Sequence, residues 1–442
     1  MKLLSIFLIV FFLSNCSFDN KTGIWKNESK NEVDGNKDVF KEFQTLSASN
    51  NLFKEIIAID KNYKFKLKPQ IENSTWNEKF YSYSNNYENF RYTNLNQLTF
   101  RGKKLTKYEQ NNYLLFDGGN IFTSDTKGNL IIFSIKDNEI IQKFNFYKKK
   151  YKKNKKKLNL ILEKDIVYIT DNFGYFYAYN FNLKKLIWAK NYKIPFRSNI
   201  KLLKNMIITS DQNNNLYFLN KKNGELIKSI PTEENKVKNE FVNNISLTSE
   251  SILFLNTYGT LYSIDNRSMR INWFLSLNKS IDINPNNLFK GSIVINDENY
   301  IVVSSDKNLF ILEIKSGNLI HKKNFSAFLN PQISNNHLFL VTKNNLLISV
   351  DLISGKLIYS YDINEKISEL LKIKKKNVIL KDLLILNNQI YIFLENSFVL
   401  KFNINGSLEK INKLPTKINS LPIIVESSIL YSDSKNRISV VN

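Results

Sequence analysis

Cysteine and histidine are almost absent from this chain of 442 residues, which contains one cysteine, Cys16, and two histidines, His321 and His337. A single cysteine excludes any disulfide within the chain. His337 has no cysteine, histidine or carboxylate at ligand spacing, and the sequence carries no zinc motif. No Gly-rich loop that would cradle a phosphate and no Ser, His and Asp set in a defensible order is present. The sequence therefore offers no candidate residues for metal-dependent, phosphate-binding or triad chemistry.

Long apolar runs are also scarce, and the one at the N-terminus extends only from Leu3 to Leu13. A charged start followed by an apolar stretch too short to span a bilayer predicts a secretory signal. Leu13-Ser14-Asn15-Cys16 resembles the bacterial lipobox, in which the cysteine is lipidated and becomes the mature N-terminus; Asn15 departs from the small residue usual before that cysteine. We expect a lipoprotein signal at 1–15 and lipidation at Cys16. The alternative is a secreted protein with a leftover thiol.

The residue after the cysteine is Ser17 and not aspartate, which implies sorting to the outer membrane of a Gram-negative cell. Residues 16–50 are rich in Asn, Lys, Glu, Ser and Asp and have no clear apolar period. Such a composition does not bury enough apolar surface to fold by itself, so we expect a flexible tether.

Acidic residues are outnumbered, 40 against 63 lysines and arginines, which leaves a net charge of +23. Lysine, asparagine and isoleucine dominate the whole chain, so we attribute much of this charge to overall composition rather than to an anionic partner. Nucleic acid is excluded as a partner, because the secretion signal places the protein in another compartment. The densest run, eight lysines within 148–157, predicts a solvated loop. Contact with lipid head groups or other anionic polymers of the envelope is the alternative, and 372–376 is a smaller run of the same kind.

A turn rich in Asp, Asn and Gly recurs along the chain at a mean spacing of about 44 residues. Its eight copies lie at or near Asp125, Asp171, Asp211, Asn256, Asp306, Lys343, Glu395 and Asp433. A second landmark keeps step with the turn, and its copies are GELIK, GNLIH, GKLIY and GSLEK from Gly224, Gly317, Gly355 and Gly406, with KKLIW from Lys184 and MRINW from Met269 in the same place. Around Asp171 the turn joins two β-branched and aromatic stretches, 166–170 and 175–180, which predicts a hairpin.

A repeat of about 40–45 residues with four short strands is typical of a β-propeller blade. No copy has a helical period, which excludes a helical solenoid. We therefore predict an all-β, eight-bladed propeller of four-stranded antiparallel blades, with seven blades as the fallback and almost no helix after residue 95. The expected blades are 111–147, 158–192, 197–231, 242–278, 290–325, 330–363, 380–414 and 420–442.

The two ends of this repeat predict how the ring closes. The last copy ends with the strand from Arg437 to Val441 and lacks an outer strand. The stretch from Gln97 to Lys103 has the pattern of an outer strand but precedes the first complete hairpin. Pairing of these two stretches would complete the final blade and leave no open sheet edge.

Leu67-Lys68-Pro69, Trp76 and the stretch from Asn94 to Leu105 resemble the N-terminal part of the alphaproteobacterial BamB family. These proteins are the propeller lipoproteins of the outer-membrane β-barrel assembly machinery. With the lipobox and the eight repeats, the resemblance covers nearly the whole chain, and we expect an N-terminal segment at 51–95 and a propeller at 96–442. It implies a non-enzymatic scaffold without a cofactor, anchored at the periplasmic face of the outer membrane. Its implied partners are the POTRA domains of the barrel insertase and the other lipoproteins of the complex.

In that family the POTRA domains are bound by a loop between blades that carries an apolar-x-apolar-Arg pattern, with acidic residues in the next blade. Ile194-Pro195-Phe196-Arg197 matches the pattern, which implies that Ile194, Phe196 and Arg197 are partner-binding residues with two exposed apolar side chains beside the arginine. Glu240 matches one acidic position, whereas Val242 occupies the second. The alternative is that Ile194 and Phe196 simply tuck under the blade.

Two other functions are compatible with the repeat. Quinone-dependent dehydrogenases share it, but they need carboxylates and an amide that hold Ca²⁺ against the cofactor, and commonly a vicinal disulfide, which one cysteine rules out. His321 occupies the place of Trp188, Trp273 and Tyr359 in other copies, which predicts a packing residue between blades. A propeller lipoprotein that binds envelope glycans or polymers would need aromatics and amides repeated at one rim. The Asn-rich turns could supply the amides, although asparagine is common throughout the chain.

Overall fold

The structure is a computed structural model, which describes residues 53–147, 151, 153–234, 242–278, 289 and 293–442, together with two short strands nearer the N-terminus. The chain divides into two compact units, Met1–Asn51 and Leu52–Asn442. In the first unit, β1 (Ser17–Phe18) pairs antiparallel with β2 (Trp25–Lys26) inside the stretch expected to be a tether. The expected signal at 1–15, Cys16 and the rest of the tether at 16–50 lie outside the described residues, so they remain predictions.

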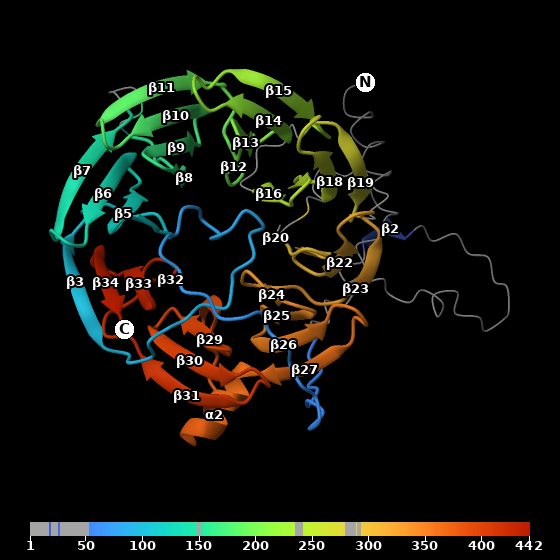
Figure 1. Ribbon diagram of the computed structural model, residues 1–442. Coiled ribbons are helices and arrows are strands. Elements are labelled where there is room, and N and C mark those ends of the chain that lie inside the picture. The colour runs from blue at the N-terminus through green and yellow to red at the C-terminus, as the bar shows by residue number, and fades with distance from the viewer. Residues whose placement is uncertain are drawn as a thin grey trace, which may run out of the picture. The chain divides into compact units, whose positions relative to one another are not determined.

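The second unit is a ring of eight four-stranded antiparallel sheets (Figure 1). The expected eight-bladed propeller is thereby confirmed over its seven-bladed fallback. We number the blades along the chain, with the sheet that unites both ends of the repeat as blade 8. In blades 1–7 the first strand along the chain lies nearest the ring axis and the fourth is outermost (Figure 1).

The strands of the first four blades are β4 (Leu115–Asp117), β5 (Asn120–Ser124), β6 (Asn129–Ser134) and β7 (Glu139–Asn145); β8 (Leu158–Glu163), β9 (Ile166–Asp171), β10 (Tyr175–Asn180) and β11 (Lys185–Asn191); β12 (Lys201–Leu203), β13 (Met206–Ser210), β14 (Asn215–Asn220) and β15 (Leu226–Pro231); and β16 (Asn244–Leu247), β17 (Ser251–Leu255), β18 (Thr260–Asp265) and β19 (Ile271–Ser276).

The strands of the last four blades are β20 (Ile293–Asn296), β21 (Tyr300–Ser304), β22 (Leu309–Glu313) and β23 (Leu319–Lys323); β24 (Gln332–Ser334), β25 (His337–Val341), β26 (Leu346–Asp351) and β27 (Leu357–Asp362); β28 (Leu380–Leu386), β29 (Gln389–Leu394), β30 (Phe398–Asn403) and β31 (Leu408–Lys413); and β3 (Leu98–Lys104) with β32 (Ile423–Val425), β33 (Ser428–Ser432) and β34 (Arg437–Val441).

The recurring turn joins the second and third strands of a blade, and its first side chain holds it closed. In blade 2 the Asp171 Oδ1 atom accepts hydrogen bonds from the backbone N–H groups of Phe173 and Tyr175, each at 2.8 Å. Gly174 adopts φ +85°, which a glycine reaches without steric cost. The same carboxylate or amide bond to the backbone recurs at Asp125, Asp211, Asn256 and Asp433. The spacing of these residues in the sequence therefore reports a local hydrogen-bonding requirement.

The second landmark packs neighbouring blades against each other. A Cβ atom added to Gly224 of blade 3 would lie 2.6 Å from the Trp188 ring of blade 2. Gly317 approaches Trp273 in the same way, and Gly355 approaches the ring of His321, each across one blade junction. The prediction that His321 packs between blades is therefore confirmed.

The ring closes as the sequence predicted. β3 pairs antiparallel with β34, with Leu98 opposite Val441 and Arg101 opposite Ser439. The outer strand of blade 8 is thus supplied by the chain before blade 1, and its inner three strands by the C-terminus. This pairing completes the fourth strand of blade 8, so β34 is not left as an unpaired sheet edge.

The described residues after 95 contain one short α-helix, which agrees with the expectation of almost no helix there. α2 (Ile363–Leu371) follows β27, and the side chain of Asp362 caps it by accepting from the N–H groups of Asn364 and Glu365. Ile363 is buried and Ile367 packs against the core, four residues apart on one helical face. This local apolar period in INEKISELL favours the helix, although the helix itself was not predicted.

Residues 71–93, which we call the plug segment, run through the centre of the ring (Figure 1, blue). The segment reaches the axis after residues 53–68 have crossed blade 6, where Ile57 pairs with Ser360 of β27 and the N–H of Lys68 donates to Ser334 Oγ. Compact unit 2 begins at Leu52, so the expected N-terminal segment 51–95 packs together with the propeller.

Candidate functional site

The four residues Ile194-Pro195-Phe196-Arg197, which we call the docking loop, lie in the connection between β11 of blade 2 and β12 of blade 3. Because each blade has four antiparallel strands, every connection from one blade to the next lies on the same rim of the ring. We call this the connection rim. The turns between second and third strands share it, so the docking loop lies beside the Asp171 and Asp211 turns.

Backbone hydrogen bonds tie the docking loop to three blades. The Phe196 N–H donates to the carbonyl of Asp171 in blade 2 at 3.2 Å, and the Arg197 N–H donates to that of Ser210 in blade 3 at 3.0 Å. The Arg197 carbonyl accepts from the N–H of Asn243, just before blade 4, at 2.9 Å. A loop held on both sides loses little conformational entropy on binding a partner.

The expectation that both apolar side chains of the loop are exposed is wrong for Phe196. Its side chain is 2% exposed and packs against the rings of Phe176 and Tyr192 at centroid distances of 5.8 and 5.7 Å. The physical reason is that the junction of blades 2 and 3 leaves space for one aromatic ring under the loop, which Phe196 fills. Ile194 is half-buried, and its backbone lies against Gly174, where an added Cβ would lie 2.8 Å from the Ile194 nitrogen.

The guanidinium of Arg197 is half-buried, and no carboxylate among the described residues forms an ion pair with it. Its Nε atom is buried without a hydrogen-bond partner. A buried donor without a hydrogen-bond partner costs free energy. A hydrogen bond from Arg197 to a carboxylate of a binding partner would therefore be favourable. Glu240, the expected acidic residue, lies outside the described residues, and Val242 is 50% exposed beside Asn243.

The plug segment makes hydrogen bonds to the innermost part of every blade in turn, which was not predicted from the sequence. Its partners, in order from blade 8 through blades 1 to 7 and back to blade 8, are Asn73 with Ile424, Trp76 with Phe116, Asn77 with Leu162, Ser82 with Lys201, Tyr83 with Leu247, Ser84 with Asn296, Asn86 with Ile333, Phe90 with Ile385, and Thr93 with Ser427. The segment therefore completes one circuit inside the channel.

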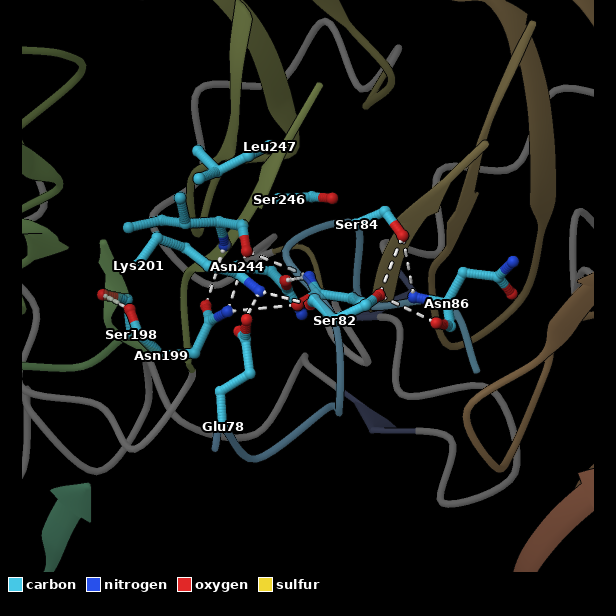
Figure 2. A network of polar contacts seen from close by, with 12 residues as sticks. Glu78, Ser82, Ser84, Asn86, Ser198, Asn199, Lys201, Asn244, Ser246 and Leu247 are labelled. Carbon is cyan, nitrogen blue, oxygen red and sulfur yellow. Dashed lines mark hydrogen bonds and ion pairs between the residues drawn. The ribbon is translucent and has the colours of Figure 1, made fainter. Parts of the chain in front are cut away.

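Two side chains hold the plug segment to blades 3, 4 and 5 (Figure 2). The ammonium of Lys201 is fully buried and bonds to the Glu78 carboxylate and to the Ser82 carbonyl, the latter at 2.8 Å. Burial lowers the pKa of Lys201, and the Glu78 charge opposes that shift. The Asn85 amide donates to the carbonyls of Ile245 and Val294, each at 2.9 Å, and so bridges two blades.

The second histidine also contacts the N-terminal segment. His337, 6% exposed on β25, accepts at Nε2 from the Lys66 N–H at 3.3 Å, and Tyr63 Oη lies 3.3 Å from Nδ1. Burial lowers its pKa, which favours the neutral ring that can accept this bond. Within the described part of the chain, no group of three or more His, Cys, Asp and Glu residues could hold a metal ion. No described helix is long and apolar enough to cross a membrane.

The plug segment lacked any signal that sequence reasoning could use. Its residues Tyr81-Ser82-Tyr83-Ser84 alternate over four positions only, and Asn85-Asn86 end that alternation, which is too short to predict a strand. Arg197, in contrast, was singled out by its motif, and its role in binding a partner stays a prediction. The sequence therefore located the loop on the rim but not the filling of the channel.

Comparison with known proteins gives a family and a fold. The sequence matches the family described as "Outer membrane protein assembly factor BamB" over residues 155–361 and 245–441, two overlapping stretches that span most of the ring. No curated protein matches.

Among solved structures, the chain is similar to BamB from Moraxella catarrhalis, with a TM-score of 0.60, 8% identity, and coverage of 77% of this chain and 99% of the other. The computationally designed Ika8 protein has a TM-score of 0.56 at 10% identity, with 77% and 99% covered. A europium-containing methanol dehydrogenase has a TM-score of 0.58 at 10% identity, with 84% and 89% covered. At these identities the likeness shows the propeller fold alone.

Proposed function

This chain belongs to the protein family described as outer membrane protein assembly factor BamB, and we propose that it is a scaffold of the outer-membrane β-barrel assembly complex. In this proposal the propeller binds the periplasmic POTRA domains of the barrel insertase and works without a cofactor. The single observation that carries it is the docking loop, which is tied to three blades and presents an arginine with no ion-pair partner among the described residues.

The proposed contact uses Arg197 and the half-buried Ile194 and Pro195 at its edge, with Phe196 as the support beneath them. Pro195 fixes its own φ, and its carbonyl accepts from the Gln212 N–H at 2.8 Å. A preorganised arginine can donate two parallel hydrogen bonds to a carboxylate, which a lysine does not reproduce geometrically. Glu240 in the following connection would supply charge of the opposite sign to a basic group on the partner.

A scaffold also fits the filled channel better than a dehydrogenase does. The plug segment occupies the ring axis with the chain's own side chains and backbone, from Trp76 to Phe90. The buried ion pair of Lys201 and Glu78 is already satisfied by the segment itself. The surfaces left for a partner are the outer strands and the rims, and loops on a rigid ring are suited to protein docking.

We propose that the protein is held at the periplasmic face of the outer membrane by a lipid on Cys16, with 1–15 removed as a signal and 16–50 as a tether. Fractionation checks this anchor directly. Cys16→Ala is expected to leave an uncut precursor that no longer fractionates with the outer membrane, because the thiol that receives the lipid is gone. A Cys16→Ala protein that stays with the outer membrane would show that something other than this lipid holds it.

The docking proposal is tested by capturing the insertase from detergent-solubilised envelope with Arg197→Glu. Removing one central anchor costs about 2 kcal/mol, or about thirtyfold in affinity, and reversing its charge costs more. We expect capture to be lost while the thermal midpoint stays unchanged, because the side chain makes no ion pair in the ring. Phe196→Ala should instead lower the thermal midpoint, since a buried phenylalanine contributes about 3–5 kcal/mol to folding.

The matched control is Arg267→Glu, the same charge change in the turn between β18 and β19 on the opposite rim. It should capture the insertase as the unaltered protein does. Normal capture by Arg197→Glu would overturn this site, and equal loss in both variants would point to net charge instead of the loop. Calorimetry with envelope glycans addresses the alternative function, and binding there would favour the glycan-binding propeller.

A further inference from the structure

The connection between blades 6 and 7 differs from the other described connections on its rim. It spans 17 residues, 363–379, whereas the four other connections that the structure describes completely span eight to ten residues. It carries α2, which lies outside the ring of sheets and contacts β27 and β31 (Figure 1). Blades do not need such a length to join, so the extra residues form an element of their own.

The inner side of this element is firmly seated on the ring. Ile363 is buried and Ile367 packs against the core between blades 6 and 7. The carbonyl of Ser368 accepts hydrogen bonds from the N–H groups of Lys372 and Ile373, which fixes the turn after the helix. The outer side of α2 is therefore presented in one orientation.

The end of α2 and the chain after it expose several aliphatic side chains. Four large aliphatic side chains, which we call the apolar tip, are between 44% and 63% exposed, and they are Leu370, Leu371, Ile373 and Ile379. Single exposed aliphatic residues are common, but four within ten residues of one connection are not.

Lysines are interleaved with the apolar tip. Lys372, Lys374 and Lys376 are exposed, and no described carboxylate forms an ion pair with them. Lys375 is the exception in the run, because its ammonium bonds to Asp362 at 2.5 Å. Three uncompensated positive charges thus surround the aliphatic side chains of the tip.

We propose that the apolar tip and its lysines bind the surface of an anionic phospholipid bilayer. Aliphatic side chains enter the boundary between head groups and acyl chains, while lysines beside them bind head-group phosphates. The charge pattern favours lipid over a protein partner, because lysine is depleted in the cores of protein interfaces, where aromatic residues and arginine are enriched. Neither an aromatic residue nor an arginine occurs in 363–379.

The apolar tip and the docking loop are separate sites on the ring. The 6–7 and 2–3 connections lie on the same rim and are separated by four of the eight blades, so they are on opposite sides of the ring. The bilayer contact and the insertase contact therefore use different residues. The inference stands on α2 itself and holds or fails independently of the insertase proposal.

The test places a fluorescent probe on the tip. Cys16 is the only native cysteine, so the full chain carrying Cys16→Ser and Leu371→Cys can be labelled with an environment-sensitive dye at one site. The probe vesicles contain equal parts phosphatidylglycerol and phosphatidylcholine, and neutral vesicles contain phosphatidylcholine alone. The matched control carries Leu183→Cys, a leucine 73% exposed in the turn between β10 and β11.

We expect the label at 371 to shift to shorter wavelength and to become protected from an aqueous quencher with the anionic vesicles only. The label at 183 should stay unchanged with both vesicles. Lys372→Glu with Lys374→Glu and Lys376→Glu should weaken the apparent affinity by about a hundredfold or more, because each surface lysine contributes about fivefold. Added salt should weaken it as well.

Three results would overturn the inference. An unshifted label at 371 in anionic vesicles would show that the tip does not reach the bilayer. Equal shifts in anionic and neutral vesicles would assign the contact to apolar side chains without the lysines. A shift that appears only when the purified insertase is added, without lipid, would assign the tip to a protein partner.

Discussion

At the scale of single residues, burial disfavours the charged form of a carboxyl group on the innermost strand of blade 7. Asp382 is 3% exposed, and its Oδ1 accepts from the Leu383 N–H at 2.9 Å, while Oδ2 has no hydrogen-bond partner. Burial raises its pKa to about 7, against the opposing effects of that hydrogen bond and of Lys381. The folded protein therefore retains a proton that the unfolded chain loses near pH 4.

The sign of the pH dependence follows from this difference. Between about pH 4 and pH 7 the folded state binds more protons than the unfolded state, so the free energy of unfolding falls as pH rises through that range. Asp382→Asn keeps the acceptor for Leu383 and removes the ionisation. We expect it to stabilise the protein by about 2 kcal/mol at pH 8 and to have little effect at pH 4. Denaturant titrations at the two pH values check this, and an equal effect at both would contradict it.

At the scale of elements, neighbouring blades are joined by an aromatic ring on one and a glycine on the next. Trp188 lies against Gly224, and its Nε1–H donates to the Lys221 carbonyl at 3.0 Å, so the ring is fixed and does not yield easily. His321 repeats the arrangement against Gly355, with Nε2 at 3.0 Å from the Ile353 carbonyl. Shape at these contacts decides whether consecutive sheets pack at full density.

Gly224→Ala tests that contact. Its φ of +68° costs an alanine about 1–2 kcal/mol, and the overlap with Trp188 adds about 1–3 kcal/mol. Gly118→Ala is the matched control, because Gly118 has φ +53° and nothing within 4 Å of an added Cβ. Thermal unfolding of both variants separates backbone strain from overlap. If the two variants lose the same stability, the close approach of Gly224 to Trp188 contributes nothing to the loss.

At the scale of the whole molecule, the ring is closed twice. β3 pairs with β34 at the circumference, and the plug segment bonds to all eight blades at the axis. The second closure includes a fully buried ion pair, Lys201 with Glu78. A buried charge that loses its partner costs about 3–5 kcal/mol. Removal of the plug segment from the channel is therefore energetically unfavourable.

Two truncations test the inner closure. A chain of residues 52–442 keeps the complete second unit and should retain the thermal midpoint of the full chain. A chain of residues 97–442 keeps β3 but loses the plug segment, and we expect its midpoint to fall by about 10 °C or more. Calorimetry measures both. A midpoint in the shorter chain equal to that of the longer one would show that the channel needs no filling.

The sequence by itself determined the ring, its eight blades and its closure, because each rests on a local requirement that recurs. Asp171 and its counterparts hold their turns through backbone groups two to four residues away. Gly224 and its counterparts mark the turns where blades meet. The spacing of Ile363 and Ile367 also fits one face of a helix, although α2 was not predicted. Periodic local patterns of this kind can be recognised from the sequence alone, because they do not depend on residues that are close only in space.

Only the tertiary structure decided what fills the channel and which side of the docking loop is exposed. Asn85 bonds to residues more than 150 positions away, and no local pattern encodes such partners. Phe196 is buried against Phe176 of blade 2 and Tyr192 of its own connection, and it belongs to a cluster that also holds Ile207 and Leu219 of blade 3. Exposure at a junction depends on the packing of two sheets, so a motif locates the loop, whereas the fold determines which of its side chains a partner can reach.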